Sequence, residues 1–346
     1  MSAPPRAPKS AGGRPLDVLV VCDLGGPPPP DHDCTTLLKD DTFETERSVV
    51  EALRRLGHGV RLFGLYDDIH GLIETLQRRP PDLVFNLCEA FDRDRRHEPN
   101  IVALFELMQV RYTGAGPKAL RICKDKGLTK TILSYHRIPI PRFVVSRRSR
   151  PIQSLKKFSY PAFIKPLGLE ASEGIAQMSF VDSEKDGLER VRFVHDSLGV
   201  DAIVEEYVDG RELYVSILGN HRLRVFPPRE LFFDQIPPDE PRFVTFKAKW
   251  DDAYRKRWGI RSAPARDIPA ATLADLNDMC RRVYRHFEIN GYARIDLRLN
   301  GRGEPVFLEA NPNPSLSSAE DFAQSARAGG IEYDDLIARI LHLAGT

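Results

Sequence analysis

The chain has 346 residues, enough for two or three domains with full hydrophobic cores, and its 50 basic and 49 acidic side chains leave a formal net charge of +1. This balance provides no chain-wide field that would attract nucleic acid or an acidic membrane, and no apolar run approaches the roughly 20 residues that a membrane span needs. The five cysteines are scattered without a Cys-x-x-Cys pair, which favours reduced thiols and a cytoplasmic location.

The first part of the chain alternates short apolar runs with helical patterns. Residues 1–13, rich in Pro, Ser, Ala and Gly, are expected to form a disordered tail. From residue 14 the pattern predicts strands at 17–22, 60–65 and 83–87, and helices at 44–56, 69–78 and 101–108. This order is typical of α/β proteins with helices on both faces of a parallel sheet, so we expect a Rossmann-like N-terminal domain over 14–120. A Pro- and Asp-rich loop at 23–41 interrupts it, and the sequence assigns this loop no role.

The middle of the chain predicts a small α+β domain over 121–208. A helix is expected at 126–136, and a second helix at 184–198 lies between strands at 162–166 and 203–207. A loop of small residues, 168–174, follows directly after Lys165.

The last part predicts a C-terminal α+β domain over 209–346. Strands are expected at 213–218 and 223–226, followed by a polar, aromatic stretch at 237–262. A helix of about 17 residues with one apolar face precedes a strand hairpin, and a final helix begins at Tyr333.

The hairpin carries the most informative cluster of the sequence. Its two apolar runs hold Ala293-Arg294-Ile295-Asp296 and Leu308-Glu309-Ala310-Asn311, joined by a Gly-rich turn. Asp296, Glu309 and Asn311 supply three hard oxygen ligands at the ends of paired strands, with Arg294 one ladder step away. Such a cluster is costly unless a cation and an anion use it, so it predicts a magnesium–phosphate site.

Further polar residues, in a fixed order along the chain, fit a nucleotide site. Lys165 ends a strand before the small-residue loop, and Lys126 begins a helix, so both ammonium groups are expected at phosphates. Glu205, Glu206, Tyr207 and Val208 end a strand where backbone groups and one glutamate can contact adenine. Glu212 is placed for ribose hydroxyls, and Lys249 for closing over the terminal phosphate. Each feature alone has an ordinary structural interpretation, and the argument depends on their order.

From about residue 14 to the end, the chain resembles the ATP-grasp superfamily, and within it the D-alanine–D-alanine ligases. The residues that carry the resemblance are 123–126, 160–166, 205–208, Glu212, 291–296 and 308–311, with 111–114 matching the end of the first domain. The resemblance implies a three-domain fold that clasps ATP and two Mg²⁺ ions (Mn²⁺ is an alternative) between two sheets. It implies phosphorylation of a carboxylate by ATP and attack of an amine on the acyl-phosphate. Lys126, Lys165, Ser172 and Lys249 would then contact ATP, and Arg294 would stabilise the oxyanion.

The departures from the family pattern fall among the substrate residues. Two adjacent serines of the glycine loop are Ala171 and Ser172 here, and a tyrosine after the closing lysine is Trp250. After Asn311, Ser315 and Ser317 are candidate substrate residues, but Glu320 stands about where the family has an anion-binding serine. A carboxylate there would repel a carboxylate and attract an amine or guanidinium, although Glu320 and Asp321 could simply face water at a helix N-terminus.

The sequence therefore predicts an ATP-dependent carboxylate–amine ligase for small amino acids or carboxylic acids, with an acceptor other than plain D-alanine. The alternatives are an authentic D-alanine–D-alanine ligase and, from another class, a non-catalytic ATP-binding regulatory protein. A nicotinamide dehydrogenase is disfavoured because no glycine fingerprint follows residues 17–22. The resemblance also suggests a homodimer.

Overall fold

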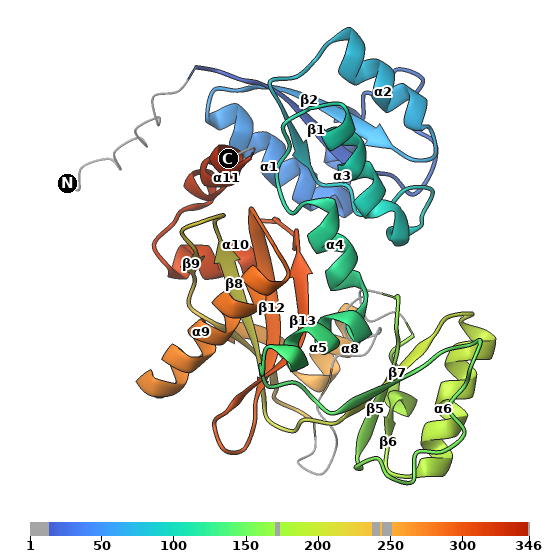
Figure 1. The fold of residues 1–346 in the computed structure, drawn as a ribbon. Helices are drawn as coiled ribbons and strands as arrows, with labels where there is room; N and C mark the ends of the chain where they lie inside the picture. Colours follow the sequence, from blue (N-terminus) through green and yellow to red (C-terminus); the bar gives the residue numbers. More distant parts are fainter. Residues whose placement is uncertain (1–13, 170–173, 237–242, 244–250, 345–346) are drawn as a thin grey trace.

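The computed structural model describes residues 14–169, 174–236, 243 and 251–344, and the predicted disordered tail lies outside these residues. Within them the chain builds three sheets (Figure 1): a parallel sheet of three strands, an antiparallel sheet of four and an antiparallel sheet of six. The predicted α/β fold class is confirmed.

The N-terminal sheet has the strand order β2-β1-β3, and both neighbours of β1 run parallel to it. Its elements are β1 (Asp17–Asp23), α1 (Glu44–Arg55), β2 (Gly59–Leu65), α2 (Ile69–Arg78), β3 (Leu83–Asn86), α3 (Glu98–Leu107) and α4 (Pro117–Lys124). Alternate residues of β1 point to opposite faces, so both faces of this sheet need a cover of helices.

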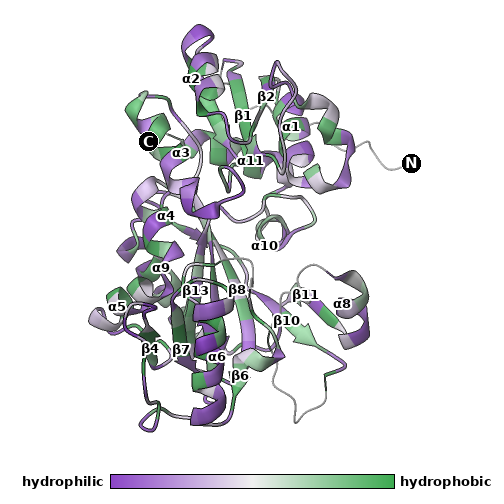
Figure 2. Cartoon of the chain, turned by 90° about the vertical axis from the view of Figure 1, so that its right-hand side faces the viewer, coloured by the Kyte–Doolittle hydropathy of each residue, from purple (hydrophilic) through white to green (hydrophobic). Residues whose placement is uncertain are grey.

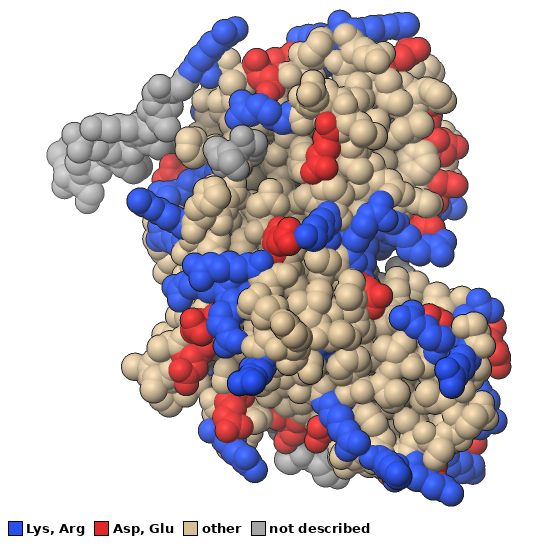
Figure 3. All heavy atoms as spheres, in the orientation of Figure 1, with Lys and Arg blue, Asp and Glu red and all other residues tan. Residues whose placement is uncertain are grey.

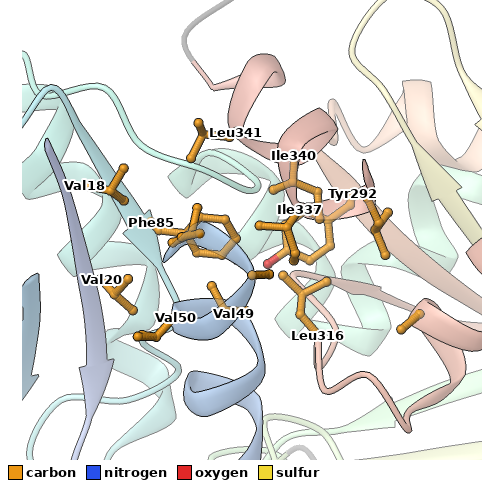
Figure 4. Packing of buried hydrophobic residues seen from close by; sticks show 14 of the residues in the cluster. Val18, Val20, Val49, Val50, Phe85, Tyr292, Leu316, Ile337, Ile340 and Leu341 are labelled. Carbon is orange, nitrogen blue, oxygen red and sulfur yellow. The ribbon is translucent and has the colours of Figure 1, made fainter. Parts of the chain in front are cut away.

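Helices on both faces were predicted, but the part of the C-terminal helix in one of these covers was not. Leu19 and Val21 pack with residues of α2 and α3, whereas Val18 and Val20 pack with α1 and with α11 (Tyr333–Leu343), the last helix of the chain. Figure 4 shows Ile337, Ile340 and Leu341 of α11 beside the α1 and β-strand residues of this core. The C-terminal helix thus completes the core of the N-terminal sheet.

The Pro- and Asp-rich loop lies along β2, at the edge of that sheet. Asp33 forms an antiparallel bridge with Phe63, and the ring of His32 stacks on Phe63 with centroids 4.7 Å apart. Cys34 comes so close to Gly64 that an added Cβ would stand 2.3 Å from its Sγ, which explains the glycine in the strand. The loop therefore covers a strand edge before it reaches α1.

The central sheet has the order β4-β7-β5-β6 and is covered by one helix. Its elements are α5 (Lys126–Tyr135), β4 (Phe143–Ser146), β5 (Ala162–Pro166), β6 (Phe180–Val181), α6 (Glu184–Ser197) and β7 (Ala202–Glu206). Ala162 and Ile164 of β5, with Ala202 and Val204 of β7, pack against α6, which turns a hydrophilic face outward (Figure 2). The opposite face of the sheet is left for the cleft.

The C-terminal sheet has the order β11-β10-β8-β12-β13, with β9 also paired to β8. Its elements are β8 (Arg211–Leu218), β9 (Arg224–Val225), β10 (Arg229–Phe233), α8 (Asp252–Trp258), β11 (Ile260–Pro264), α9 (Ala270–His286), β12 (Tyr292–Leu299), β13 (Pro305–Pro312) and α10 (Asp321–Ala328). Alternate residues such as Val215, Ile295 and Phe307 pack against Leu276 and Val283 of α9. The other face again borders the cleft.

Basic and acidic side chains are interspersed on the face drawn in Figure 3, in keeping with the near-zero net charge. Among the described residues, no helix combines the length and the apolar character needed to cross a bilayer.

Candidate active site

The predicted hairpin brings its four polar residues together. β12 and β13 are antiparallel, with Asp296 opposite Glu309 and Arg294 opposite Asn311. Residues opposite each other in an antiparallel pair share a face, and residues two apart along a strand share it too. All four side chains therefore lie on the face turned away from α9, and all four line the same cleft.

Arg294, Asp296 and Asn311 form one hydrogen-bonded group. Arg294 donates from Nε and Nη2 to the two carboxylate oxygens of Asp296, at 2.7 and 2.8 Å, and its guanidinium lies over the ring of Tyr214. Asn311 donates from Nδ2 to Asp296 Oδ2 at 3.0 Å. Because the amide uses its nitrogen for this bond, its oxygen can act as a ligand. Nη1 of Arg294 has no hydrogen-bond partner among the described residues.

Burial and two neighbouring carboxylates disfavour the charged form of Asp296. Burial raises the pKa of Asp296, and the charges of Glu309 and Glu212 add to the rise, so that despite Arg294 the pKa reaches about 6. A bound cation would relieve this repulsion. The set of two carboxylates and an amide oxygen also has the hard donors that Mg²⁺ and Mn²⁺ prefer, so the residues fit a divalent ion.

The wall across the cleft comes from the central sheet. Phe163 and Glu205 are cross-strand partners, and Lys165 lies two residues beyond Phe163, so all three share the face opposite α6. Lys165 donates to Glu205 Oε2 at 2.9 Å, and Lys130 of α5 is 3.0 Å from Oε1. Burial alone would raise the pKa of Glu205, but the two ammonium groups outweigh it and hold the pKa at about 2.

Lys130 is a site residue that the sequence interpretation missed. Its side chain is fully buried, and Nζ also donates to the carbonyl oxygen of Leu308 at 2.9 Å, next to Glu309. It thereby connects the central sheet with β13. The available signal was a lysine on the buried face of a helix, four residues after Lys126, where an apolar residue is usual.

Lys126 is held at the start of α5 by a capped helix end. Asp125 is the N-cap, and its carboxylate accepts from the backbone N–H groups of Gly127 and Leu128, both at 2.9 Å. Lys126 donates to the carbonyl oxygen of Leu169, at the start of the small-residue loop, at 2.7 Å. The predicted partners, a phosphate-binding lysine and that loop, are thus neighbours.

The two glutamates that follow Val204 point to opposite faces of β7. Glu205 is buried on the cleft face, whereas Glu206 is exposed. The carbonyl of Val208 accepts from Arg298 Nη1 at 2.7 Å, and Tyr207 stacks edge-on with Phe180. All four predicted hinge residues, Glu205 to Val208, line the cleft.

Glu212 is oriented by two residues that were also missed. Arg298 donates to Glu212 Oε2 at 2.8 Å, and Tyr214 donates its hydroxyl to Oε1 at 3.2 Å. Arg298 continues the two-residue spacing of Arg294 and Asp296 along β12, a pattern that could have revealed it.

The predicted substrate residues Ser315, Ser317 and Glu320 line the same cleft, at the side of the N-terminal sheet. Ser317 donates its hydroxyl to Glu44 Oε1 at 2.8 Å, and the hydroxyls of Ser315 and Thr45 are 3.1 Å apart. The remaining predictions, Ser172, Lys249 and Trp250, lie outside the described residues.

The cleft that these residues line has a volume of about 1280 Å³. It is bordered by all three sheets, because residues of β1 and β3, of β5 and β7, and of β8, β12 and β13 contribute to it, together with the first turn of α1. Space of this size, lined by charged residues of both signs, suits a nucleotide together with small substrates.

Comparison with known proteins gives a family match. The family described as "D-ala D-ala ligase C-terminus" matches residues 125–342. The uncharacterized protein y4sG of Sinorhizobium fredii is 32% identical over 306 residues, covering 86% of each chain. The D-alanine–D-alanine ligase of Gluconobacter oxydans is 28% identical over 294 residues, covering 84% of this chain and 89% of that protein.

Solved structures share the fold. The D-alanine–D-alanine ligase of Bacillus anthracis complexed with ATP superposes with a TM-score of 0.73 at 18% identity, covering 95% of this chain and 97% of that one. The VanG D-Ala:D-Ser ligase of Enterococcus faecalis gives a TM-score of 0.69 at 18% identity, covering 95% and 99%.

Proposed function

The chain belongs to the D-alanine–D-alanine ligase family of ATP-grasp ligases, and on that premise we propose that it joins a carboxylate to an amine through an acyl-phosphate. ATP transfers its γ-phosphoryl group to a carboxylate oxygen and leaves as ADP. The amine nitrogen then attacks the carbonyl carbon, the C–O bond to phosphate breaks, and phosphate leaves as the nitrogen loses a proton. The substrates that are activated are small amino acids or carboxylic acids, and the acceptor differs from plain D-alanine.

The nucleotide would lie between the central and C-terminal sheets. Lys126 and Lys165 approach it from the central unit, where their ammonium groups neutralise phosphate oxygens. To do so, Lys165 would share its charge between Glu205 and the phosphates. Glu205 and the backbone of residues 206–208 border the adenine end, and Glu212 is held by Arg298 for ribose hydroxyls. Lys249 and Ser172 are assigned to the phosphates from their sequence motifs alone.

Asp296, Glu309 and Asn311 would hold two Mg²⁺ ions, or Mn²⁺, on the cleft face of the hairpin. When bound, these ions would neutralise charge on the terminal phosphates during phosphoryl transfer. Arg294 has a different part, because its fork to Asp296 fixes the guanidinium and directs Nη1 elsewhere. That N–H group is suited to stabilise the oxyanion formed when the amine attacks.

The observation that carries this proposal is the convergence of Arg294, Asp296, Glu309 and Asn311 on one wall of a cleft whose other wall bears Lys126 and Lys165. An oxyanion donor among the metal ligands favours catalysis over mere nucleotide binding, because a binding protein has no need of it.

The test is ADP release measured with MgATP and pairs drawn from D- and L-amino acids and small carboxylic acids. We expect ADP only when a carboxylate and an amine are both present, and a rate with D-alanine alone below that of the best pair. Fastest turnover with D-alanine alone would identify an authentic D-alanine–D-alanine ligase. Tight ATP binding without turnover for any pair would identify a regulatory protein.

The variant Glu309→Gln should lower the rate of the best pair by about 10²- to 10³-fold while its circular dichroism spectrum stays unchanged, since one metal ligand loses its charge. Glu304→Gln, at the exposed turn of the same hairpin, is the matched control and should keep its activity. Full activity of Glu309→Gln would show that the metal assignment is wrong.

A further inference from the structure

One wall of the cleft combines hydroxyl groups with several carboxylates. We call it the acceptor wall: the loop 314–320, the start of α10, and the first turn of α1 that faces them. Residues of all three line the same cleft as Arg294, so a substrate whose amine attacks beside Arg294 would extend toward this wall.

The hydroxyl donors of the acceptor wall already serve the chain's own groups. Ser317 is buried and donates to the carboxylate of Glu44 at 2.8 Å. Ser315 and Thr45 share a hydrogen bond at 3.1 Å, and Tyr333 donates to the carbonyl of Leu316 at 2.6 Å. Glu44 therefore occupies the position that a substrate carboxylate would need in order to accept from Ser317.

Two nitrogens of the guanidinium beside this wall are committed in the same way. Arg229 donates from Nε to Asp321 Oδ1 at 2.6 Å and from Nη2 to the carbonyl of Ser262 at 2.9 Å. Ser262 also donates its hydroxyl to Asp321 Oδ1. The first N–H groups of α10 receive no side-chain cap, but Glu320 at the N-cap and Asp321 beside it already place negative charge at this helix end. A substrate carboxylate would have to displace or approach these carboxylates.

What the wall offers instead is negative charge without a counter-ion. Glu320 is exposed in the cleft, and its carboxylate has no ion-pair partner among the described residues. Glu46, in the first turn of α1, lines the same cleft, but burial together with Asp23 and Glu89 raises its pKa to about 7, so at neutral pH it adds only part of a charge to that of Glu320. Arg95 lies nearby but is paired with Glu89 at 2.9 Å.

We infer that Glu44 and Glu320 are specificity-determining residues, which exclude an acceptor carboxylate and select an amine with a second cationic group at its far end. This inference rests on the proposed ligase function. The acceptor class is a diamine, or an amine with a guanidinium, that lacks the carboxylate of an amino acid. One nitrogen forms the amide bond by the steps given above, and the other remains protonated beside Glu320.

Three probes, 1,4-diaminobutane, ornithine and butylamine, separate the effect of the acceptor's carboxylate from that of its second ammonium group. Ornithine is 1,4-diaminobutane with one added carboxylate, and butylamine is the same chain without the second amine. Binding of each probe to the full-length protein, saturated with Mg²⁺ and a non-hydrolysable ATP analogue, is measured by calorimetry. We expect 1,4-diaminobutane to bind at least about fivefold more tightly than butylamine or either enantiomer of ornithine, as one partly exposed ion pair provides.

The variant Glu320→Gln should lose the preference for 1,4-diaminobutane over butylamine, and Glu320→Ser should narrow the gap between 1,4-diaminobutane and ornithine. Glu332→Gln changes the N-cap of α11, an exposed glutamate outside the cleft lining, and should leave every preference unchanged. The inference is overturned if ornithine or D-alanine binds as tightly as 1,4-diaminobutane, or if no probe binds. It is also overturned if Glu320→Gln lowers the affinity for all probes by the same factor.

ADP release with the same probes separates this inference from the ligase proposal. Turnover with amino-acid acceptors but not with diamines overturns the acceptor class and leaves the ligase standing. Selective binding of 1,4-diaminobutane without ADP release from any pair would support the acceptor wall and count against the ligase.

Discussion

Buried charged side chains carry a large desolvation cost, and in this protein they are concentrated at the cleft. Glu205 lies between Lys130 and Lys165, Arg294 holds Asp296, and Arg298 holds Glu212. Desolvation of such pairs costs about as much as their attraction returns, so they add little net stability. Their consequence is geometric, because each functional group is held by a partner before any ligand arrives.

Replacing Lys130 with methionine tests this positioning. The variant keeps most of the side-chain volume but removes one of two cations beside Glu205, so we expect a loss of about 2–3 kcal/mol in the free energy of unfolding. The KM for ATP should also rise at least about tenfold while Lys130→Arg retains part of the affinity. Urea unfolding and ATP titration measure both effects, with the exposed Lys185→Met as control. Unchanged ATP affinity in a folded Lys130→Met variant would contradict the positioning role.

Glu46 predicts a dependence of stability on pH. The pKa of this carboxyl is raised from 4.5 to about 7, so the folded protein binds the proton more tightly than the unfolded chain does. Its contribution to stability is therefore full below pH 4.5 and is lost as the pH rises through 7. Glu46→Gln should melt a few degrees above the wild type at pH 8, and this gain should disappear near pH 4. Thermal unfolding at the two pH values measures this difference in melting temperature. A difference that is equal at pH 8 and pH 4 would contradict the raised pKa of Glu46.

In the central and C-terminal sheets, the two faces have different roles. In each, one set of alternate residues packs under a helix, α6 or α9, and the other set carries the polar residues of the site. This alternation is visible in the sequence as apolar and polar residues two apart, which is why the hairpin cluster could be predicted before its geometry was known.

The N-cap of α5 gives a prediction at this scale. Asp125 holds the first turn that carries Lys126, so Asp125→Ala should lower the free energy of unfolding by about 1 kcal/mol and raise the KM for ATP. Asp125→Asn keeps the hydrogen-bond acceptor and should retain most of the stability and most of the ATP affinity. Thermal unfolding and ATP titration compare the two variants. An equal loss of ATP affinity in both would show that the charge of Asp125, rather than its cap, is what matters.

Elements with weak local patterns escaped prediction for a physical reason. β11 is the edge strand of the C-terminal sheet and pairs with β10, from which α8 separates it in sequence, and β4 lies at the edge of the central sheet. Such short strands are stabilised by pairing with a neighbour more than by their own residues. Their sequences therefore show no apolar periodicity from which the strands could be predicted. Lys130 escaped for a related reason, since its two partners, Glu205 and the Leu308 carbonyl, are distant in sequence.

At the scale of the whole molecule, the C-terminal end of the described chain packs against the N-terminal sheet. α11 packs on α1 in the core of the N-terminal sheet, and buried Leu316 and Tyr292 join the same core (Figure 4). The loop after the candidate metal ligands is thus attached to the N-terminal unit, which places the acceptor wall at the junction of the two. Contacts across some 280 residues of sequence, such as Arg55 with Asp334, cannot be read from local patterns. A homodimer stays a prediction from the resemblance.

The central claim is that a carboxylate is activated by phosphorylation in this cleft. The most direct measurement uses a pool of amino acids whose carboxylates carry ¹⁸O, incubated with the enzyme, MgATP and an amine, followed by mass analysis of the phosphate released. Because the carboxylate oxygen that attacks ATP leaves with the phosphate, we predict one ¹⁸O atom in each inorganic phosphate and an equal amount of amide. Phosphate without ¹⁸O, or ATP bound without release of any phosphate, would contradict the account.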